Sequence, residues 1–145
     1  MEAKKNLKLL SVVILALTAF SAFRVIFETF TLDFNPETLP EGTTKGAVLA
    51  AQIIILVFSF VLMLPEIYVG VRGLKVSKSP DSSRAYITWA KIITVICVIA
   101  SIAYVIDLIK GERIVSNVLA LFDTLTDAAL FYFFVRYAKH VSGEA

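Results

Sequence analysis

The chain has 145 residues, of which 58% are hydrophobic and 18% are charged, and its mean hydropathy is +0.81. Soluble domains are about 45–50% apolar and about 25% charged, so this composition excludes an ordinary soluble domain. The net charge of +2 is too small for a nucleic-acid-binding protein, and the single cysteine (Cys97) and single histidine (His140) exclude a disulfide framework and a Cys or His metal cluster within one chain.

The apolar residues form four long runs, at about 7–30, 47–75, 85–109 and 114–138. A helix that crosses a bilayer needs about 20 apolar residues, and each run is longer than that. We therefore predict an all-α fold, a single four-span transmembrane domain over 1–145 in which the helices form a bundle. The first run also has the basic start of a cleaved signal peptide, but its length favours a helix that stays in the protein.

The basic residues give the expected orientation. One side of the membrane would carry Lys4, Lys5, Lys8, Arg72, Lys75, Lys78, Arg84, Lys91, Arg136 and Lys139, and the other side would carry Arg24, Lys45, Lys110 and Arg113. Because cytoplasmic segments are enriched in Lys and Arg, both termini are predicted to be cytoplasmic. We expect a bacterial-type inner (plasma) membrane protein that crosses the bilayer several times.

The segments between the runs contain the residues expected of turns and helix starts. The segment 31–46 holds two prolines and two glycines, which predicts a loop. The segment 76–84 supplies Asp81 or Ser82 as the predicted N-cap of the third helix. The short segment 110–113 predicts a tight turn and an antiparallel hairpin of the third and fourth helices.

Every predicted helix carries a stripe of small or polar residues. The first run has Ser11, Thr18, Ser21, Arg24 and Glu28, the second has Gln52, Ser59, Glu66 and Gly73, the third has Thr88, Lys91, Thr94 and Ser101, and the fourth has Ser116, Ala120, Asp123 and Asp127. Lipid offers no hydrogen-bond partners, so these stripes are expected to face the interior of the bundle. Gly70 and Gly73 would let two helix backbones approach closely.

Charged residues at membrane depth need a specific explanation, because each costs about 2.5–3.5 kcal/mol on insertion scales. Glu66 and Lys91 both lie roughly 10–13 Å from the predicted cytoplasmic edge, so they are predicted to form an ion pair. Arg24 and Asp123 could pair in the same way nearer the outer edge. Glu28 and Asp107 would lie close enough to the outer rim to reach water.

Asp127 is left as the acid without a predicted basic partner. It lies near the bilayer midplane, one helical turn from Asp123, where two carboxylates about 5–6 Å apart do not both ionise cheaply. Asp127 is therefore expected to hold a proton or a cation, or to donate as a neutral acid to a hydroxyl such as that of Thr94 or Ser101. Pro65, beside Glu66, is expected to shape or kink the second helix.

Three classes of function are considered on these residues. An enzyme is the least supported, because no catalytic motif or cofactor-binding motif is present. A small oligomeric transporter or channel for protons or cationic solutes would use Asp123, Asp127 and Glu66, with Lys91 and Arg24 as further binding candidates. The preferred interpretation is a non-enzymatic accessory, assembly or regulatory subunit that partners with the bilayer and with itself or another membrane protein, without a cofactor, metal or nucleic acid.

Overall fold

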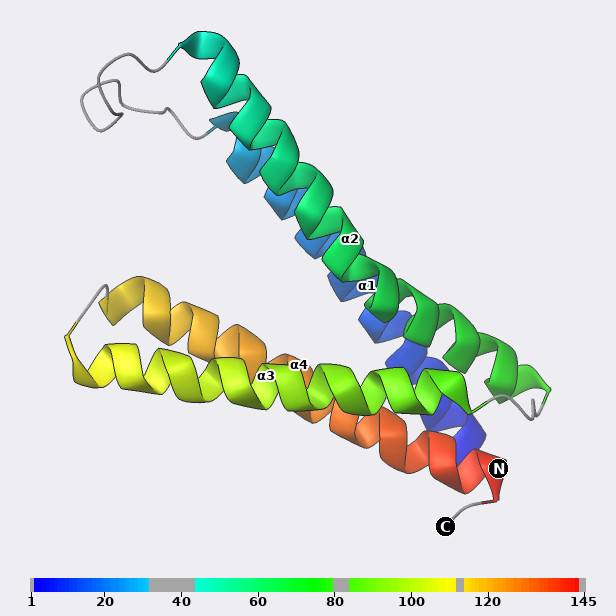
Figure 1. The fold of residues 1–145 in the computed structure, drawn as a ribbon. Coiled ribbons are helices and arrows are strands. Elements are labelled where there is room, and N and C mark those ends of the chain that lie inside the picture. The colour runs from blue at the N-terminus through cyan, green and yellow to red at the C-terminus, as the bar shows by residue number, and fades with distance from the viewer. Residues whose placement is uncertain (1, 32–43, 80–83, 112–113, 144–145) are drawn as a thin grey trace. The chain divides into compact units, whose positions relative to one another are not determined.

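The computed structural model describes residues 2–31, 44–79, 84–111 and 114–143. These residues form four α-helices and no strand, in agreement with the predicted all-α class. The helices are α1 (Glu2–Thr31), α2 (Lys45–Lys78), α3 (Ala85–Ile109) and α4 (Ile114–Ser142), as Figure 1 shows. All four are long and apolar enough to cross a membrane.

Three of the helices extend beyond the predicted apolar runs into the neighbouring segments that contain Lys and Arg. α1 begins at Glu2, α2 continues to Lys78 and α4 continues to Ser142, whereas α3 has the predicted bounds. Lysine and arginine are good helix formers, so the backbone hydrogen bonding continues past the last apolar residue. Hydropathy therefore marks the apolar part of each helix and not its end.

Local hydrogen bonds explain where the helices start and stop. The Thr44 hydroxyl accepts a hydrogen bond from the Ala47 backbone N–H at 3.2 Å, which caps the start of α2. The N-cap of α3 is Arg84, whose side chain makes no capping hydrogen bond, and the predicted caps Asp81 and Ser82 lie outside the described residues. After α3 the chain turns through Gly111, whose φ of 75° favours glycine.

The packing divides the chain into two compact units. Unit 1 comprises Met1–Leu15 and Pro65–Ala145, and unit 2 comprises Ala16–Leu64. Within unit 2, the two helix segments are joined by a hydrogen bond of 3.0 Å from Gln52 Nε2 to the Thr29 carbonyl. The boundary in α2 lies at Pro65, which has no N–H to donate within the helix.

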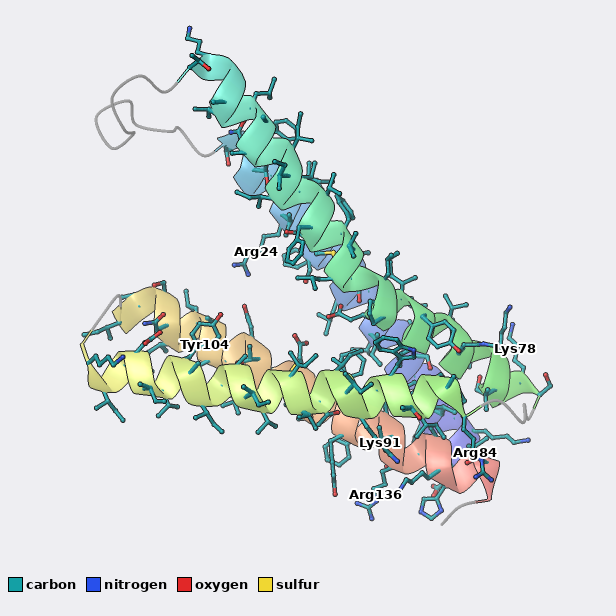
Figure 2. The ribbon with its side chains drawn as sticks, viewed as in Figure 1. Arg24, Lys78, Arg84, Lys91, Tyr104 and Arg136 are labelled. Carbon is teal, nitrogen blue, oxygen red and sulfur yellow. The ribbon has the colours of Figure 1, made fainter. Side chains whose placement is uncertain are left out.

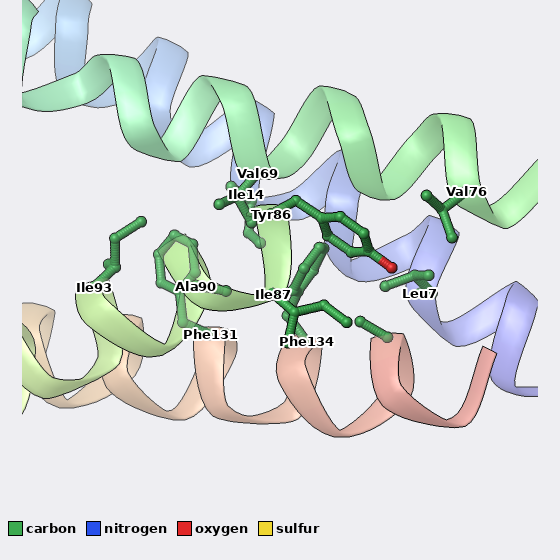
Figure 3. Packing of buried hydrophobic residues seen from close by; sticks show 11 residues of the cluster. Leu7, Ile14, Val69, Val76, Tyr86, Ile87, Ala90, Ile93, Phe131 and Phe134 are labelled. Atoms are coloured by element: carbon green, nitrogen blue, oxygen red, sulfur yellow. The ribbon is translucent and has the colours of Figure 1, made fainter. Parts of the chain in front are cut away.

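The apolar core lies in unit 1 and is formed by side chains from all four helices (Figure 3). It contains Leu7, Ile14, Val69, Val76, Tyr86, Ile87, Ala90, Ile93, Phe131, Phe134 and Ala138. The rings of Tyr86 and Phe134 meet edge to face, with centroids 6.1 Å apart. This core holds α3 against α4 and brings the first turns of α1 and the last turns of α2 to the same cluster.

Most large apolar side chains of the described helices are exposed. The exposed fraction reaches 81% for Ile109, 76% for Val115 and 70% for Phe122. Soluble monomers rarely expose apolar patches larger than a few hundred Å², because water penalises such surfaces. The helices thus present to their surroundings the kind of surface that lipid tails or other apolar helices cover.

Candidate functional site

Three half-buried side chains with acidic protons come from three helices of unit 1. They are Glu66 on α2, Cys97 on α3 and Asp127 on α4. Cys97 lies within electrostatic range of both Asp127 and Glu66. Counted along the α3–α4 hairpin, Cys97 and Asp127 are nearly equidistant from the connecting turn, which explains why they lie at one level. We call these three residues the acid–thiol cluster.

A second polar contact lies one turn away from the acid–thiol cluster along α3. The Ser101 hydroxyl lies 3.0 Å from Thr124 Oγ1 on α4 and 2.8 Å from the Cys97 carbonyl oxygen. Thr124 Oγ1 in turn lies 2.9 Å from the Ala120 carbonyl oxygen, to which it donates. Ser101 therefore joins α3 to α4 through Thr124, whereas from the sequence it was one of two predicted acceptors for Asp127.

Asp123 and Asp127 interact electrostatically, as expected for acids one turn apart, but their surroundings differ. Asp127 is half-buried beside α3, whereas Asp123 is exposed on the surface of α4. The predicted inward stripe of α4 therefore turns toward the surface at Asp123 and at Ser116. The next residue, Thr124, is half-buried and faces α3 instead of Asp123.

The helix bounds place Glu66 and Lys91 at different distances from the neighbouring ends of α2 and α3. Glu66 is twelve residues from the end of α2, about 18 Å along the axis, and Lys91 is six residues from the start of α3, about 9 Å. The sequence-based distance for Glu66 was counted from Lys75 and is three residues shorter, because α2 continues to Lys78. The Glu66–Lys91 ion pair stays a prediction. Lys91 is exposed, and Figure 2 shows it pointing outward from α3 together with Arg136 of α4.

The remaining predicted site residues are placed as follows. Arg24 is exposed on α1 within unit 2 (Figure 2), so its predicted contact with Asp123 of unit 1 stays a prediction. Thr94 is half-buried and Thr88 is exposed, so the stripe of α3 faces inward only from Thr94 onward. Asp107 is half-buried near the end of α3, and the side chain of Glu28 lies outside the described residues.

The glycines of α2 make the close helix contacts that the sequence predicts. A side chain at Gly73 would meet the Ser11 hydroxyl of α1 and would lie 2.5 Å from Phe134 Cε2 of α4. At Gly70 it would lie 2.7 Å from Leu15 Cγ. Ser11 is fully buried there and donates to the Leu7 carbonyl at 2.7 Å. These contacts fix three helices around the core and hold the cluster residues in register.

Sequence reasoning missed two components of this region. Thr124 carries the hydroxyl contact between α3 and α4, but it lies outside the stripe that the spacing of Ser116, Ala120, Asp123 and Asp127 defines. Cys97 enters the sequence-based predictions only because a single cysteine excludes a disulfide framework and a thiolate metal site within one chain. Both could have been found from the antiparallel register of the α3–α4 hairpin. In such a hairpin, facing residues have numbers with nearly the same sum, as Cys97 and Asp127 or Ser101 and Thr124 do.

The chemistry open to the acid–thiol cluster is that of proton or cation exchange. Among the described residues, no group of three His, Cys, Asp or Glu side chains is placed to hold a metal ion. Carboxyl groups inside a membrane protein can bind a proton or a monovalent cation without such a group. No protein-family model matches this sequence, and neither the curated proteins nor the solved structures include a significant match.

Proposed function

We propose that the chain is an integral membrane protein that crosses the bilayer four times and works without catalysis, as an accessory, assembly or regulatory subunit. In this role its helices pack on another membrane chain, either a second copy or a different protein. Both termini would lie in the cytoplasm, and in a bacterium the membrane would be the inner membrane. The proposal is supported by the surface of the helices and by where the core stops.

The lengths of the helices support insertion. They contain 25 to 34 residues, which correspond to about 38–51 Å of helix. The hydrocarbon layer is about 30 Å thick, so each helix can cross it and project into the headgroup regions. The exposed Ile, Leu, Val and Phe side chains along the helices match such an environment.

The restriction of the core to one end of unit 1 is the observation that favours an assembly role. In the described part of α4, the only buried side chain before Phe131 is that of Ala128, and in α3 the only one after Ile93 is that of Ser101. In α2 no residue before Val69 is buried. In lipid, helices associate through close packing and polar contacts, so the outer half of this hairpin offers a surface for a partner helix.

A photo-crosslinking experiment tests the assembly role. A photoreactive amino acid replaces Phe122, on the outer half of α4, or Phe133, an exposed phenylalanine beside the packed core. We expect the Phe122 variant to give one cross-linked species of defined mass in native membranes, identified by mass spectrometry, and the Phe133 variant to give mainly lipid adducts. Lipid adducts alone at both positions would contradict the proposal.

A second candidate function, transport of protons or small cations by an oligomer, is favoured by the acid–thiol cluster. Glu66, Cys97 and Asp127 place two carboxyl groups near one level of the helices. A path through the membrane would need at least two copies of the chain, because four helices seldom enclose one.

Proteoliposomes containing an internal pH dye separate the two candidates. A transporter is expected to collapse an imposed pH gradient or to move a monovalent cation, and Asp127→Asn should abolish this flux. The matched control is Asp107→Asn, which removes an acid close to the end of α3. Wild-type vesicles as tight as empty vesicles, over a panel of cations, would exclude transport and leave the assembly role.

A further inference from the structure

We infer that the hairpin of α3 and α4 binds the phosphate headgroup of an anionic phospholipid at its basic end, with Lys91 and Arg136 as the principal contacts. The basic residues Arg84, Lys91, Arg136 and Lys139 define this site, which we call the basic face. The inference rests on the membrane insertion proposed above, and it does not depend on the assembly role or on transport.

The two principal cations lie at similar heights on neighbouring helices. Lys91 is six residues from the start of α3 and Arg136 is six residues from the end of α4, so each lies about 9 Å from its helix end. The edge-to-face contact of Tyr86 with Phe134 holds the two helices together at this end. Figure 2 shows Lys91 and Arg136 pointing to the same side of the hairpin.

The positions of these residues on their helices explain why they share a side. Lys91 directly follows the fully buried Ala90, about 100° around α3, and is therefore turned away from the core. Arg136 follows the fully buried Phe134 by two residues and is exposed. Neither side chain forms an ion pair with another described residue.

The stretches of sequence around Lys91 and Arg136 carry positive charge only. The sequence has no Asp or Glu from Arg84 to Ile106, and none from Ala128 to Gly143. Lys91 and Arg136 therefore lie at least nine residues from any carboxylate of their own helices, the nearest being Asp107 on α3 and Asp127 on α4. Negative charge from outside the chain would balance Lys91 and Arg136, since an anionic membrane surface attracts nearby Lys and Arg side chains.

The depth of the two cations selects a lipid over a dissolved anion. Lys91 and Arg136 lie about 9 Å from the ends of their helices. From such a position a Lys or Arg side chain packs its apolar stem along the helix and extends its charged group toward the headgroups. Tyr132 lies one turn deeper than Arg136 on α4 and is 58% exposed, which suits an amphipathic ring at the border of headgroup and acyl chain. A free phosphate has no acyl chains to contact this ring.

Lipid titration of the purified full chain tests the inference. The protein is held in neutral detergent or phosphatidylcholine nanodiscs, and phosphatidylglycerol of matched acyl chains is added while binding is followed by native mass spectrometry and thermal stability. We expect saturable binding of phosphatidylglycerol in preference to phosphatidylcholine. Replacing both cations, Lys91→Gln with Arg136→Gln, should weaken this binding by about 30-fold.

The matched control removes two charges from the same end of the protein but from α1. Lys4→Gln with Lys5→Gln should change the affinity by less than threefold, because these residues lie outside the basic face. The charge-preserving pair Lys91→Arg with Arg136→Lys should retain binding, which separates loss of the site from loss of folding. Equal weakening in the Lys4 and Lys5 control would show general surface attraction and would overturn the inference.

Two further outcomes separate the lipid site from its alternatives. Inorganic phosphate is titrated alone and as a competitor, and competition at concentrations equal to those of the lipid would assign the face to a dissolved anion and overturn the inference. Carbonate extraction of wild-type membranes checks insertion independently. Release of the wild type by carbonate would refute the membrane proposal itself, whereas retention without a preference for phosphatidylglycerol would refute only the lipid site.

Discussion

At the scale of single residues, Gly73 of α2 has no space for a side chain. A Cβ there would meet the Ser11 hydroxyl and the Phe134 ring, so Gly73→Ala is expected to destabilise the protein by about 1–3 kcal/mol. Gly70→Ala should cost less, because the obstructing Leu15 is the end of a flexible side chain. Thermal unfolding in detergent measures both, with Gly46→Ala as the control because only Thr44 Oγ1 lies near that position, at 3.9 Å.

The hydroxyl contact between Ser101 and Thr124 makes a smaller, measurable contribution. Interhelical hydrogen bonds in membrane proteins average about 0.6 kcal/mol in double-mutant cycles. Ser101→Ala and Thr124→Val, singly and together, are expected to give a coupling energy of this size in reversible unfolding. Because both hydroxyls also bond to carbonyls of their own helices, coupling near zero would mean that those local bonds dominate.

Single residues could be predicted where one helix determines their surroundings. Gly70 and Gly73 were expected at close helix contacts and are found there, because a missing side chain acts at its own position. The neighbours of Cys97 and Ser101 on other helices could not be predicted, since these depend on the register between helices. If a helix end is predicted one or two turns away from its true position, every residue of that helix is assigned the wrong neighbours on the adjacent helix.

At the scale of the elements, the α3–α4 hairpin depends on Phe134. Its ring is fully buried against Tyr86 and beside Gly73, so Phe134→Ala is expected to cost about 3–5 kcal/mol of stability. The control is Phe133→Ala on the same helix, where the ring is 44% exposed and contacts Tyr132. That change should cost under about 1.5 kcal/mol in the same thermal measurement, and equal losses would show that the core is not where the structure places it.

The four helices and the α3–α4 hairpin were predictable because long apolar runs and the short 110–113 connection leave few alternatives. The basic ends of α1, α2 and α4 could not be predicted from hydropathy, because hydropathy falls at the last apolar residue of a run although the helix continues. This difference makes Glu66 lie three residues farther from the end of its helix than the sequence indicated. The sequence also placed Lys91 on the inward stripe of α3, whereas Lys91 is exposed because this stripe faces inward only from Thr94 onward.

At the scale of the whole molecule, the proposed orientation can be tested with introduced cysteines. In a Cys97→Ala background, Lys5→Cys and His140→Cys place thiols near the two termini, and Lys110→Cys places one at the α3–α4 turn; all three positions are exposed. A membrane-impermeant maleimide is expected to label Lys110→Cys in intact cells. Lys5→Cys and His140→Cys should react only after permeabilisation, and the reverse pattern would invert the topology.

The make-up of unit 1 has a consequence for how the protein is built. Its first part, Met1–Leu15, is synthesised before all of unit 2, yet the side chains it packs against include Phe134 and Ala138 near the other end of the chain. Contacts this distant in sequence form late, whereas the contiguous segment Ala16–Leu64 can pair while the ribosome is still working. A chain that stops before Phe131 would lack the part of the core that α4 supplies, Phe131, Phe134 and Ala138. The core of unit 1 is therefore complete only once α4 has been synthesised.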